Sequence, residues 1–263
     1  MLHQNCYLLS LSLSFAHSPL WCQLYAVMLI EYLEEVMRTL NEIMNAHGSD
    51  KGDGNWPNHN YAWLYDHWMA NRRTDAVNLL EIGVTRTFRD GRSFPCASVL
   101  GWAEYFPNGS VVGYDLADWT GAVDNPRISF FKGDQGSPAD LARFHSDYRL
   151  KRFDYIIDDG SHKTKDQVTS FVKLFPKLRF GGTYIIEDCS RETVEAFESL
   201  RAEGVLLPPP DCPVTLDECC FVSDACGVCI HCHLTGCAGR AKKYNHLIVA
   251  HRVIRTSVPP PTA

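Results

Sequence analysis

Two acidic clusters in the second half of the chain, one of them followed by a histidine, have residue types suited to metal-assisted proton transfer. Asp159, Glu187 and Asp188 offer the hard oxygen ligands that Mg²⁺ prefers, and Mg²⁺ keeps positions open for water or a substrate. His162 follows Asp159 closely and has a side-chain pKa near neutrality, which suits a general base that takes a proton from a hydroxyl group.

The same residues have a plainer interpretation. Ser161 and His162 could cap a following helix, with Asp158 and Asp159 solvated. The second acidic pair, Glu187-Asp188, favours metal-assisted proton transfer, because helix caps at Ser161 and His162 would not require a second pair of acids.

Five short apolar runs, each bounded by Gly, Asp or Asn, predict the strands that position these residues: 77–84, 110–116, 128–131, 153–157 and 183–186. Helices are expected over 61–71, 162–178 and 191–203, and a further strand over 244–254. This order predicts an α/β fold with a doubly wound, mostly parallel sheet. Ligands of such a sheet bind at the carboxyl ends of its strands.

Every one of the five strands ends in an acidic residue: Glu81, Asp115, Asp134, Asp158-Asp159 and Glu187-Asp188. One such acid alone is usually a helix cap or a turn former. Five in succession would converge on one edge of the sheet.

The turn after the first strand argues against a dinucleotide. Gly83 is followed by Val84 and Thr85, so the glycine pattern that lets a pyrophosphate approach the backbone is missing. S-adenosylmethionine (SAM) has no phosphate but carries ribose hydroxyls, an ammonium group and a sulfonium. Carboxylates suit these groups, with Asp115 on the ribose diol and Glu81 near the cationic end.

Residues 78–188 resemble the class I SAM-dependent methyltransferases, particularly the metal-dependent sugar O-methyltransferases of macrolide and related natural-product biosynthesis. The matching segments are LLEIGV (79–84), GWAEYFPNGSVVGYDLAD (101–118), FKGDQGSP (131–138), FDYIIDDGSH (153–162) and SFVKLFPKLRFGGTYIIEDCS (170–190). Upstream, GSDKG (48–52) and HNYAWLYDHW (59–68) are similar to the segment that precedes the catalytic domain of that family.

The resemblance implies a Rossmann-like fold, SAM and Mg²⁺ as cofactors, and a small hydroxylated substrate, either a sugar or a glycosylated natural product. It implies metal ligation by Asp159, Glu187 and Asp188, and a proton acceptor in His162. The residues expected on the cofactor side are Glu81, Gly83, Asp115, Asp134, Gln135 and Asp158.

The chain departs from that family at the first turn and near the C-terminus. Thr85 stands where the family usually has a second glycine, and 86–96 is expected to be an extended or altered loop. The alternative is therefore a catalytically impaired methyltransferase fold that uses a Cys-rich insert for zinc binding or interaction. Lys51 and His59-Asn60-Tyr61 are expected to be ordinary polar loop residues, with a contribution to the cofactor or substrate edge as the alternative.

The predicted organisation has four parts. A leader over 1–23, either a signal-like segment or an extra helix, precedes an N-terminal helical segment over 24–75, which includes a helix over 24–44. The methyltransferase domain follows over 76–254, with a Cys-rich insert over 212–240, and a disordered tail covers 255–263.

Composition limits the partners of the protein. A net charge of −6 argues against a nucleic-acid footprint, and the apolar run of the leader is too short to span a membrane. Because the cysteines cluster locally, we expect a reduced, cytoplasmic protein. Cys226, Cys229 and Cys232 have spacing suited to a structural Zn²⁺, with free thiols or disulfides as alternatives. A homo-oligomer is compatible with the sequence.

Overall fold

The computed structural model describes residues 38–55, 59, 61–87, 93–202, 222–223 and 246–251, and gives only the backbone at 85–87, 93–95, 198, 201–202, 222–223 and 246–251. The leader over 1–23, most of the helix over 24–44, most of the Cys-rich insert and the tail over 255–263 lie outside the described residues.

The described strands form one main sheet in the order β5-β4-β1-β6-β7-β9-β8. The strands are β1 (Asn78–Ile82), β4 (Ser110–Asp115), β5 (Ile128–Lys132), β6 (Phe153–Asp158), β7 (Leu178–Cys189), β8 (Val222–Ser223) and β9 (His246–His251). The pairs from β5 to β7 are parallel, whereas β9 runs antiparallel to both β7 and β8. This confirms the predicted α/β fold with a doubly wound, mostly parallel sheet.

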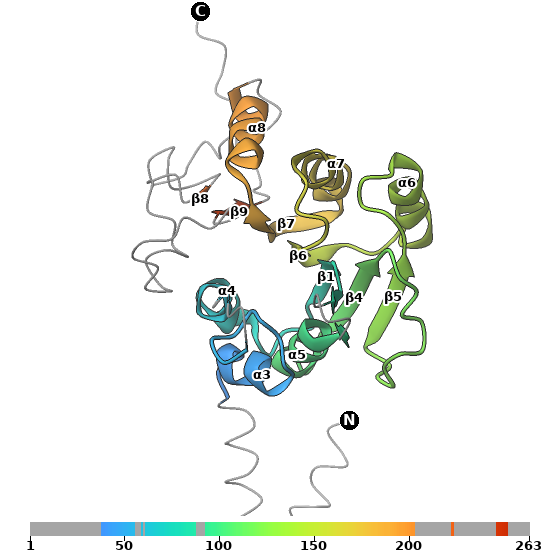
Figure 1. Cartoon of the computed structure of the whole chain (residues 1–263). Coiled ribbons are helices and arrows are strands. Elements are labelled where there is room, and N and C mark those ends of the chain that lie inside the picture. The colour runs from blue at the N-terminus through green and yellow to red at the C-terminus, as the bar shows by residue number, and fades with distance from the viewer. Residues whose placement is uncertain are drawn as a thin grey trace, which may run out of the picture. The chain divides into compact units, whose positions relative to one another are not determined.

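Helices cover both faces of the sheet, as Figure 1 shows. One face carries α3 (Leu40–Ala46), α4 (Ala62–Met69) and α5 (Ala97–Tyr105), and the other carries α6 (Pro138–Asp147), α7 (Thr164–Leu174) and α8 (Arg191–Ala202). Short 3₁₀ helices, Ala70–Arg72 and Phe175–Lys177, follow α4 and α7.

Alternation along the strands divides the core between these two helical layers. Leu79 and Ile185 belong to the apolar cluster on the α3–α5 side, whereas Leu80 and Ile186 belong to the cluster on the α6–α8 side. Successive side chains of a strand point to opposite faces, so a strand covered on both sides must be apolar almost throughout. The continuous apolar runs in the sequence reflect this coverage of the strands on both faces.

The start of β7 differs from the prediction. The expected strand began at residue 183, after a glycine turn that closed the preceding helix, but β7 already begins at Leu178. The pairing with β6 shifts between Phe153↔Leu178 and Tyr155↔Thr183, and Gly181 within the shifted stretch has a φ of +78°. The glycines therefore lie in a bulge inside the strand.

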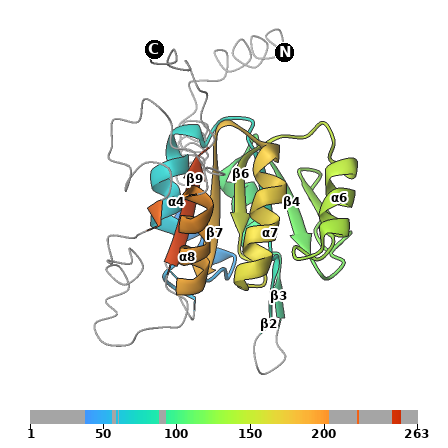
Figure 2. The same cartoon turned by 90° about the horizontal axis from the view of Figure 1, so that it is seen from above.

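The segment after β1 is a hairpin. The expected altered loop over 86–96 contains β3 (Ser93–Pro95), which pairs antiparallel with β2 (Thr85–Thr87). Figure 2 shows this hairpin projecting from the end of the sheet. The side chain of Thr85 lies outside the described part of the structure, so its expected effect on SAM stays a prediction.

The Cys-rich insert contributes to the sheet, because β8 lies within 212–240 and pairs with β9. The cysteines proposed for zinc, Cys226, Cys229 and Cys232, lie outside the described residues, and that site stays a prediction. Among the described residues, no helix has the length and apolar character needed to cross a membrane.

Gly83, just after β1, packs against the backbone that follows β6, and no side chain fits at this position. Its φ is +83°, and a Cβ there would lie 2.0 Å from the carbonyl oxygen of Asp159. We expect Gly83→Ala to lower the free energy of unfolding by roughly 2–4 kcal/mol, because it combines backbone strain with a backbone collision.

Chemical denaturation of purified variants checks this expectation. Gly121→Ala is the matched control, since Gly121 has a φ of +80° but no atom within 4 Å of the added Cβ. It should lose only about 1 kcal/mol. Equal losses in the two variants would show that the close approach at Gly83 does not matter.

Candidate active site

Two neighbouring cavities open at the carboxyl ends of the parallel strands. Their volumes are about 210 Å³ and about 190 Å³, and Gly83, Asp159 and Gly160 line both. A ligand in one cavity would therefore lie next to a ligand in the other.

The smaller cavity collects four of the residues expected on the cofactor side: Gly83, Asp115, Asp134 and Gln135. The Asp115 carboxylate is held by two backbone donors, Val84 N–H to Oδ2 and Ala117 N–H to Oδ1, both at 2.8 Å. A carboxylate oxygen has two lone pairs, so it can accept more than one hydrogen bond. The Asp134 side chain accepts from Gly136 N–H at 2.7 Å and shapes the adjacent turn.

Asp158 lies behind the wall of these cavities, although it was expected on the cofactor side. Its carboxylate is fully buried and accepts hydrogen bonds from Gln135 Nε2 at 2.9 Å and Ser170 Oγ at 2.5 Å. Burial raises the pKa of Asp158 to about 6, against the lowering effect of these donors. Gln135 in turn accepts from Ser161 N–H at 2.8 Å, so Asp158 supports the loop that carries His162.

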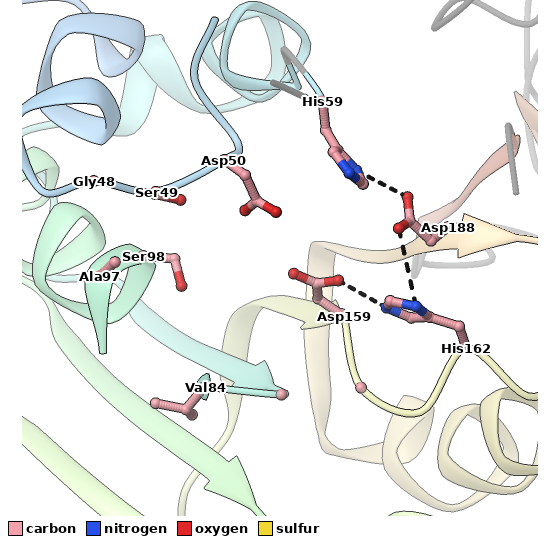
Figure 3. Close-up of a pocket in the computed structure, with 12 residues that line it drawn as sticks. Gly48, Ser49, Asp50, His59, Val84, Ala97, Ser98, Asp159, His162 and Asp188 are labelled. Carbon is pink, nitrogen blue, oxygen red and sulfur yellow. Dashed lines mark hydrogen bonds and ion pairs between the residues drawn. The ribbon is translucent and has the colours of Figure 1, made fainter. Parts of the chain in front are cut away.

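The larger cavity brings together Asp159, His162 and Asp188 (Figure 3). His162 Nε2 lies 3.0 Å from Asp159 Oδ1, and its Nδ1 lies 3.9 Å from Asp188 Oδ2. One ligand atom from each of the three residues lies within 4.8 Å of the others. This donor set could hold a cation, with carboxylate oxygens on two sides.

A local distortion of β7 turns both acids of the Glu187-Asp188 pair towards α4. In a regular strand the two side chains would point to opposite faces. Here Asp188 has a φ of +50°, and the pairing with β9 shifts between Ile186 and Cys189. As a result Tyr65 donates to Glu187 Oε1, and Tyr61 donates to Asp188 Oδ1 at 2.7 Å.

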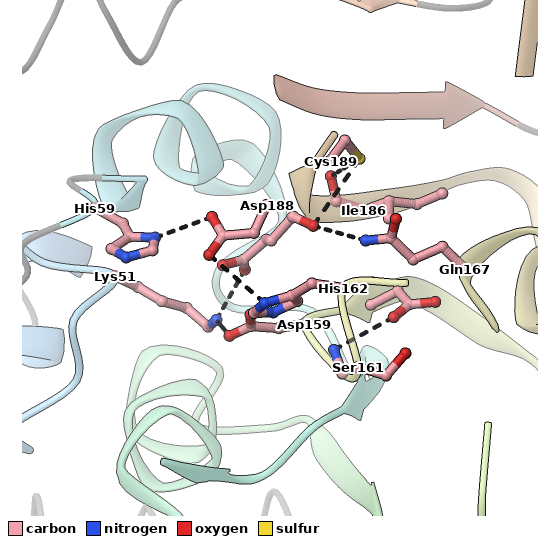
Figure 4. A network of polar contacts seen from close by, with 12 residues as sticks. Lys51, His59, Asp159, Ser161, His162, Gln167, Ile186, Asp188 and Cys189 are labelled. Atoms are coloured by element: carbon pink, nitrogen blue, oxygen red, sulfur yellow. Dashed lines mark hydrogen bonds and ion pairs between the residues drawn. The ribbon is translucent and has the colours of Figure 1, made fainter. Parts of the chain in front are cut away.

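Lys51 occupies the centre of the acidic cluster, as Figure 4 shows for its contact with Asp159. Its side chain is only 1% exposed, and Nζ lies 2.5 Å from Asp159 Oδ2, 2.8 Å from Glu187 Oε1 and 3.5 Å from Glu81 Oε1. The expectation that Lys51 is an ordinary loop residue is wrong. Glu187, expected as a metal ligand, contacts Lys51 and Tyr65 here.

Lys51 and the acids around it shift one another's pKa values. Burial opposes the charge of Lys51, but Asp159, Glu187 and Glu81 outweigh it and raise the lysine pKa well above its usual value. Burial also opposes the charge of Asp159, yet Lys51 and His162 lower its pKa. Glu187 has a raised pKa, because burial and the neighbouring Asp159 disfavour its ionised form.

Glu81, expected near the cationic end of SAM, is fully buried on the same side of the sheet. Ser98 Oγ donates to its Oε2 at 2.9 Å, whereas Oε1 has no hydrogen-bond partner among the described residues and faces Lys51. Burial raises the pKa of Glu81 to about 7, against the effects of Lys51 and Ser98.

His59 is a second histidine at the site, and it contacts the side of Asp188 that faces away from His162. His59 Nδ1 lies 3.1 Å from Asp188 Oδ1. Burial opposes the charge of His59, but Asp188 outweighs it and raises the imidazole pKa. His59 lines the larger cavity together with Gly48, Ser49 and Asp50.

Sequence reasoning missed Tyr65 as part of the site, and it gave a contribution of Lys51 and Tyr61 only as the alternative to ordinary polar loop residues. A signal for the tyrosines existed, because residues four positions apart on one helix face the same side. Nothing in the local sequence around Lys51 shows that it is buried, since the acids that surround it come from three distant strands.

The fold and the two cavities define a class. The strand order, with a single antiparallel strand next to β7, is that of the Rossmann-like class I SAM-dependent methyltransferases.

Comparisons with known proteins agree with this class, although no family model matches the chain. The 8-demethyl-8-alpha-L-rhamnosyl tetracenomycin-C 2′-O-methyltransferase of Streptomyces olivaceus is 39% identical over 155 residues, which cover 58% of this chain and 38% of that enzyme. The mycinamicin VI 2″-O-methyltransferase of Micromonospora griseorubida is 39% identical over 127 residues, 47% of this chain and 30% of that enzyme.

Among solved structures, the MycE methyltransferase of the mycinamycin pathway in complex with Mg and SAH is similar, with a TM-score of 0.60 and 26% identity. That match covers 86% of this chain and 58% of MycE. The chain thus resembles sugar O-methyltransferases but spans less than half the length of the curated relatives that it matches.

The ion pair of His162 predicts a pH dependence of stability in metal-free protein. Burial opposes the imidazolium, but Asp159 outweighs it and raises the His162 pKa from 6.5 to about 9. Between these values the folded state binds more protons than the unfolded state, so stability is lost as pH rises from about 6.5 to about 9.

Thermal unfolding in EDTA across this range measures the effect, and His162→Gln should flatten the fall in Tm. His145→Gln on α6, outside both cavities, is the control and should keep the wild-type slope. Parallel curves for wild type and His162→Gln would contradict the assignment.

Proposed function

We propose that this chain transfers a methyl group from SAM to a hydroxyl group of a sugar or glycosylated small molecule, assisted by Mg²⁺. The observation that carries the proposal is the pair of cavities that share Gly83, Asp159 and Gly160. One cavity has the features of a nucleoside site, and the other has a cation donor set beside a histidine.

The smaller cavity fits SAM through Asp115. Backbone donors orient both oxygens of this carboxylate, and a carboxylate can accept hydrogen bonds from the two hydroxyls of a ribose. Gly83 lines this cavity, and the fully buried Glu81, two residues before it on β1, is proposed to lie towards the cationic end of SAM. SAM supplies an electrophilic methyl group on a positively charged sulfur.

The larger cavity fits a divalent cation through Asp159 and Asp188, whose oxygens are of the type that Mg²⁺ prefers. Glu187 is proposed as a third ligand, and it would have to release Lys51 or Tyr65 in part to serve as one. A bound Mg²⁺ supplies stabilisation of the negative charge that develops on the acceptor oxygen.

His162 is proposed as the general base. In the transfer, the acceptor oxygen forms a bond to the methyl carbon while the carbon–sulfur bond breaks, and the hydroxyl proton passes to a ring nitrogen of His162. The base must be neutral, so the charge of Asp159 that raises the His162 pKa has to be compensated when the acceptor binds.

The acceptor class rests on the relatives. The two curated enzymes above are O-methyltransferases whose names give a rhamnosyl tetracenomycin and mycinamicin VI, and one MycE structure contains mycinamycin VI with Mg and SAH. A glycosylated polyketide is accordingly the first acceptor class to test with this chain.

Calorimetric titration with SAM tests the cofactor site. We expect saturable binding, and we expect Asp115→Ala to weaken it by about tenfold or more, because two hydrogen bonds to a charged acceptor are lost. Asp118→Ala, in the exposed loop after β4 and outside the smaller cavity, is the matched control and should bind as wild type. Absence of any heat with millimolar SAM would remove the enzyme interpretation and favour a catalytically impaired fold.

Turnover with glycosylated macrolide and rhamnosylated aromatic acceptors tests the chemistry, with SAH formation followed by mass spectrometry. We expect His162→Ala to lower kcat by about 10²-fold or more while the SAM affinity is kept, because the base is lost but the cofactor cavity is intact. EDTA should stop turnover and Mg²⁺ should restore it.

Normal turnover of His162→Ala would exclude His162 as the base. Activity that survives exhaustive chelation would remove the cation from the mechanism. The two results are independent, because the first concerns proton transfer and the second concerns charge on the acceptor oxygen.

A further inference from the structure

We propose that Lys51 is a built-in counter-ion of the metal-binding carboxylates: a positioning residue that holds the acidic cluster together without metal and weakens its affinity for divalent cations. The inference rests on the proposed metal site.

The first observation is the placement of the ammonium group. Lys51 Nζ lies within 3.5 Å of carboxylates from the ends of three different strands, namely Glu81 on β1, Asp159 after β6 and Glu187 on β7. With 1% of its side chain exposed, water cannot replace these partners. A buried ammonium surrounded in this way neutralises charges that would otherwise repel one another.

The second observation is that the backbone of Lys51 is fixed. Its carbonyl oxygen accepts the Ala62 N–H at the start of α4 at 2.8 Å, and its N–H donates to Ser49 Oγ at 3.3 Å. Lys51 therefore connects the N-terminal segment that forms one cavity wall to the strand ends that form the other.

The third observation is that the two carboxylate oxygens of Asp159 contact different partners. Lys51 holds Oδ2 at 2.5 Å, whereas Oδ1 faces His162 at 3.0 Å. Lys51 thus orients the carboxylate so that one particular oxygen points to the cation donor set. It also holds Glu187 Oε1 together with Tyr65.

These contacts imply competition. A cation held by Asp159 shares that carboxylate with the ammonium group, and like charges at such separations repel strongly away from bulk water. Lys51 should therefore lower the affinity of the site for Mg²⁺ or Mn²⁺ while it makes folding independent of them. If Lys51 served only to fill space, its replacement would instead disorder the ligands. The affinity for the cation would then fall and not rise.

Lys51→Met tests the proposal, since methionine keeps much of the side-chain length and removes the charge. Binding of Mg²⁺ and Mn²⁺ to SAM-free protein is measured by calorimetry, and Tm is measured in EDTA and in each cation. We expect binding at least about tenfold tighter than in wild type, because the repulsion is lost. We also expect a lower Tm in EDTA and a larger rise in Tm on adding the cation.

Lys177→Met is the matched control. Lys177 is also buried, and its ammonium donates to the Tyr148 carbonyl, but it lies just before β7, at the opposite end of the strand from Glu187. Its loss should leave cation affinity and the cation-dependent rise in Tm unchanged.

The outcomes separate this inference from the proposed function. If wild type binds the cations and Lys51→Met binds them equally or more weakly, the counter-ion role is wrong and the metal site stands. If neither protein binds them, the proposed metal site is wrong and the inference falls with it. Binding by Lys51→Met alone would support the inference in its strongest form.

A second variant covers the case in which Lys51→Met does not fold in EDTA. Lys51→Met/Glu187→Gln removes one ionisable carboxyl group together with the ammonium charge, and we expect its Tm in EDTA to exceed that of Lys51→Met. Glu187→Gln alone provides the remaining corner of the double-mutant cycle. A double variant no more stable than Lys51→Met would overturn the proposal.

Discussion

The site depends on one interaction, the buried ammonium of Lys51 among the carboxylates of three strand ends. Parallel strands bring Glu81, Asp159 and Glu187 to the same edge of the sheet, where their ionised forms would repel one another without a cation. Lys51 supplies that cation from a loop outside the sheet. Lys51, which lies between α3 and α4, is therefore part of the site, and Tyr61 and Tyr65 complete it by donating to the neighbouring acids.

The backbone supports this arrangement at three uncommon positions. Gly83, His162 and Asp188 all have positive φ, and all three line the larger cavity. Such conformations cost free energy at residues other than glycine and persist only where the surrounding structure enforces them. At Asp188 this conformation directs Glu187 and Asp188 to the same side of the strand, where Tyr65 and Tyr61 donate to them.

The two cavities divide the proposed reaction between them. Asp115 and its neighbours present a fixed, acidic surface of the kind that binds ribose hydroxyls, while Asp159, His162 and Asp188 surround a space with negative charge and a titratable nitrogen. The shared residues Gly83, Asp159 and Gly160 bring the two chemistries into contact. The resemblance to sugar O-methyltransferases agrees with this division, although the matched region is less than half of each curated relative.

The sequence by itself determined the α/β class, the parallel strands and the acids at their ends, because apolar runs and strand-end residues are local features. It also carried the two acidic pairs and His162. Only the tertiary structure decided which way each acid points: Asp158 turns to Ser170 beneath the loop, while its neighbour Asp159 turns to Lys51. The insertion of β9 beside β7, the distortion at Asp188 and the burial of Lys51 were likewise beyond local reasoning. These features depend on groups far apart in the chain, whose mutual charges and packing exist only once the sheet has formed.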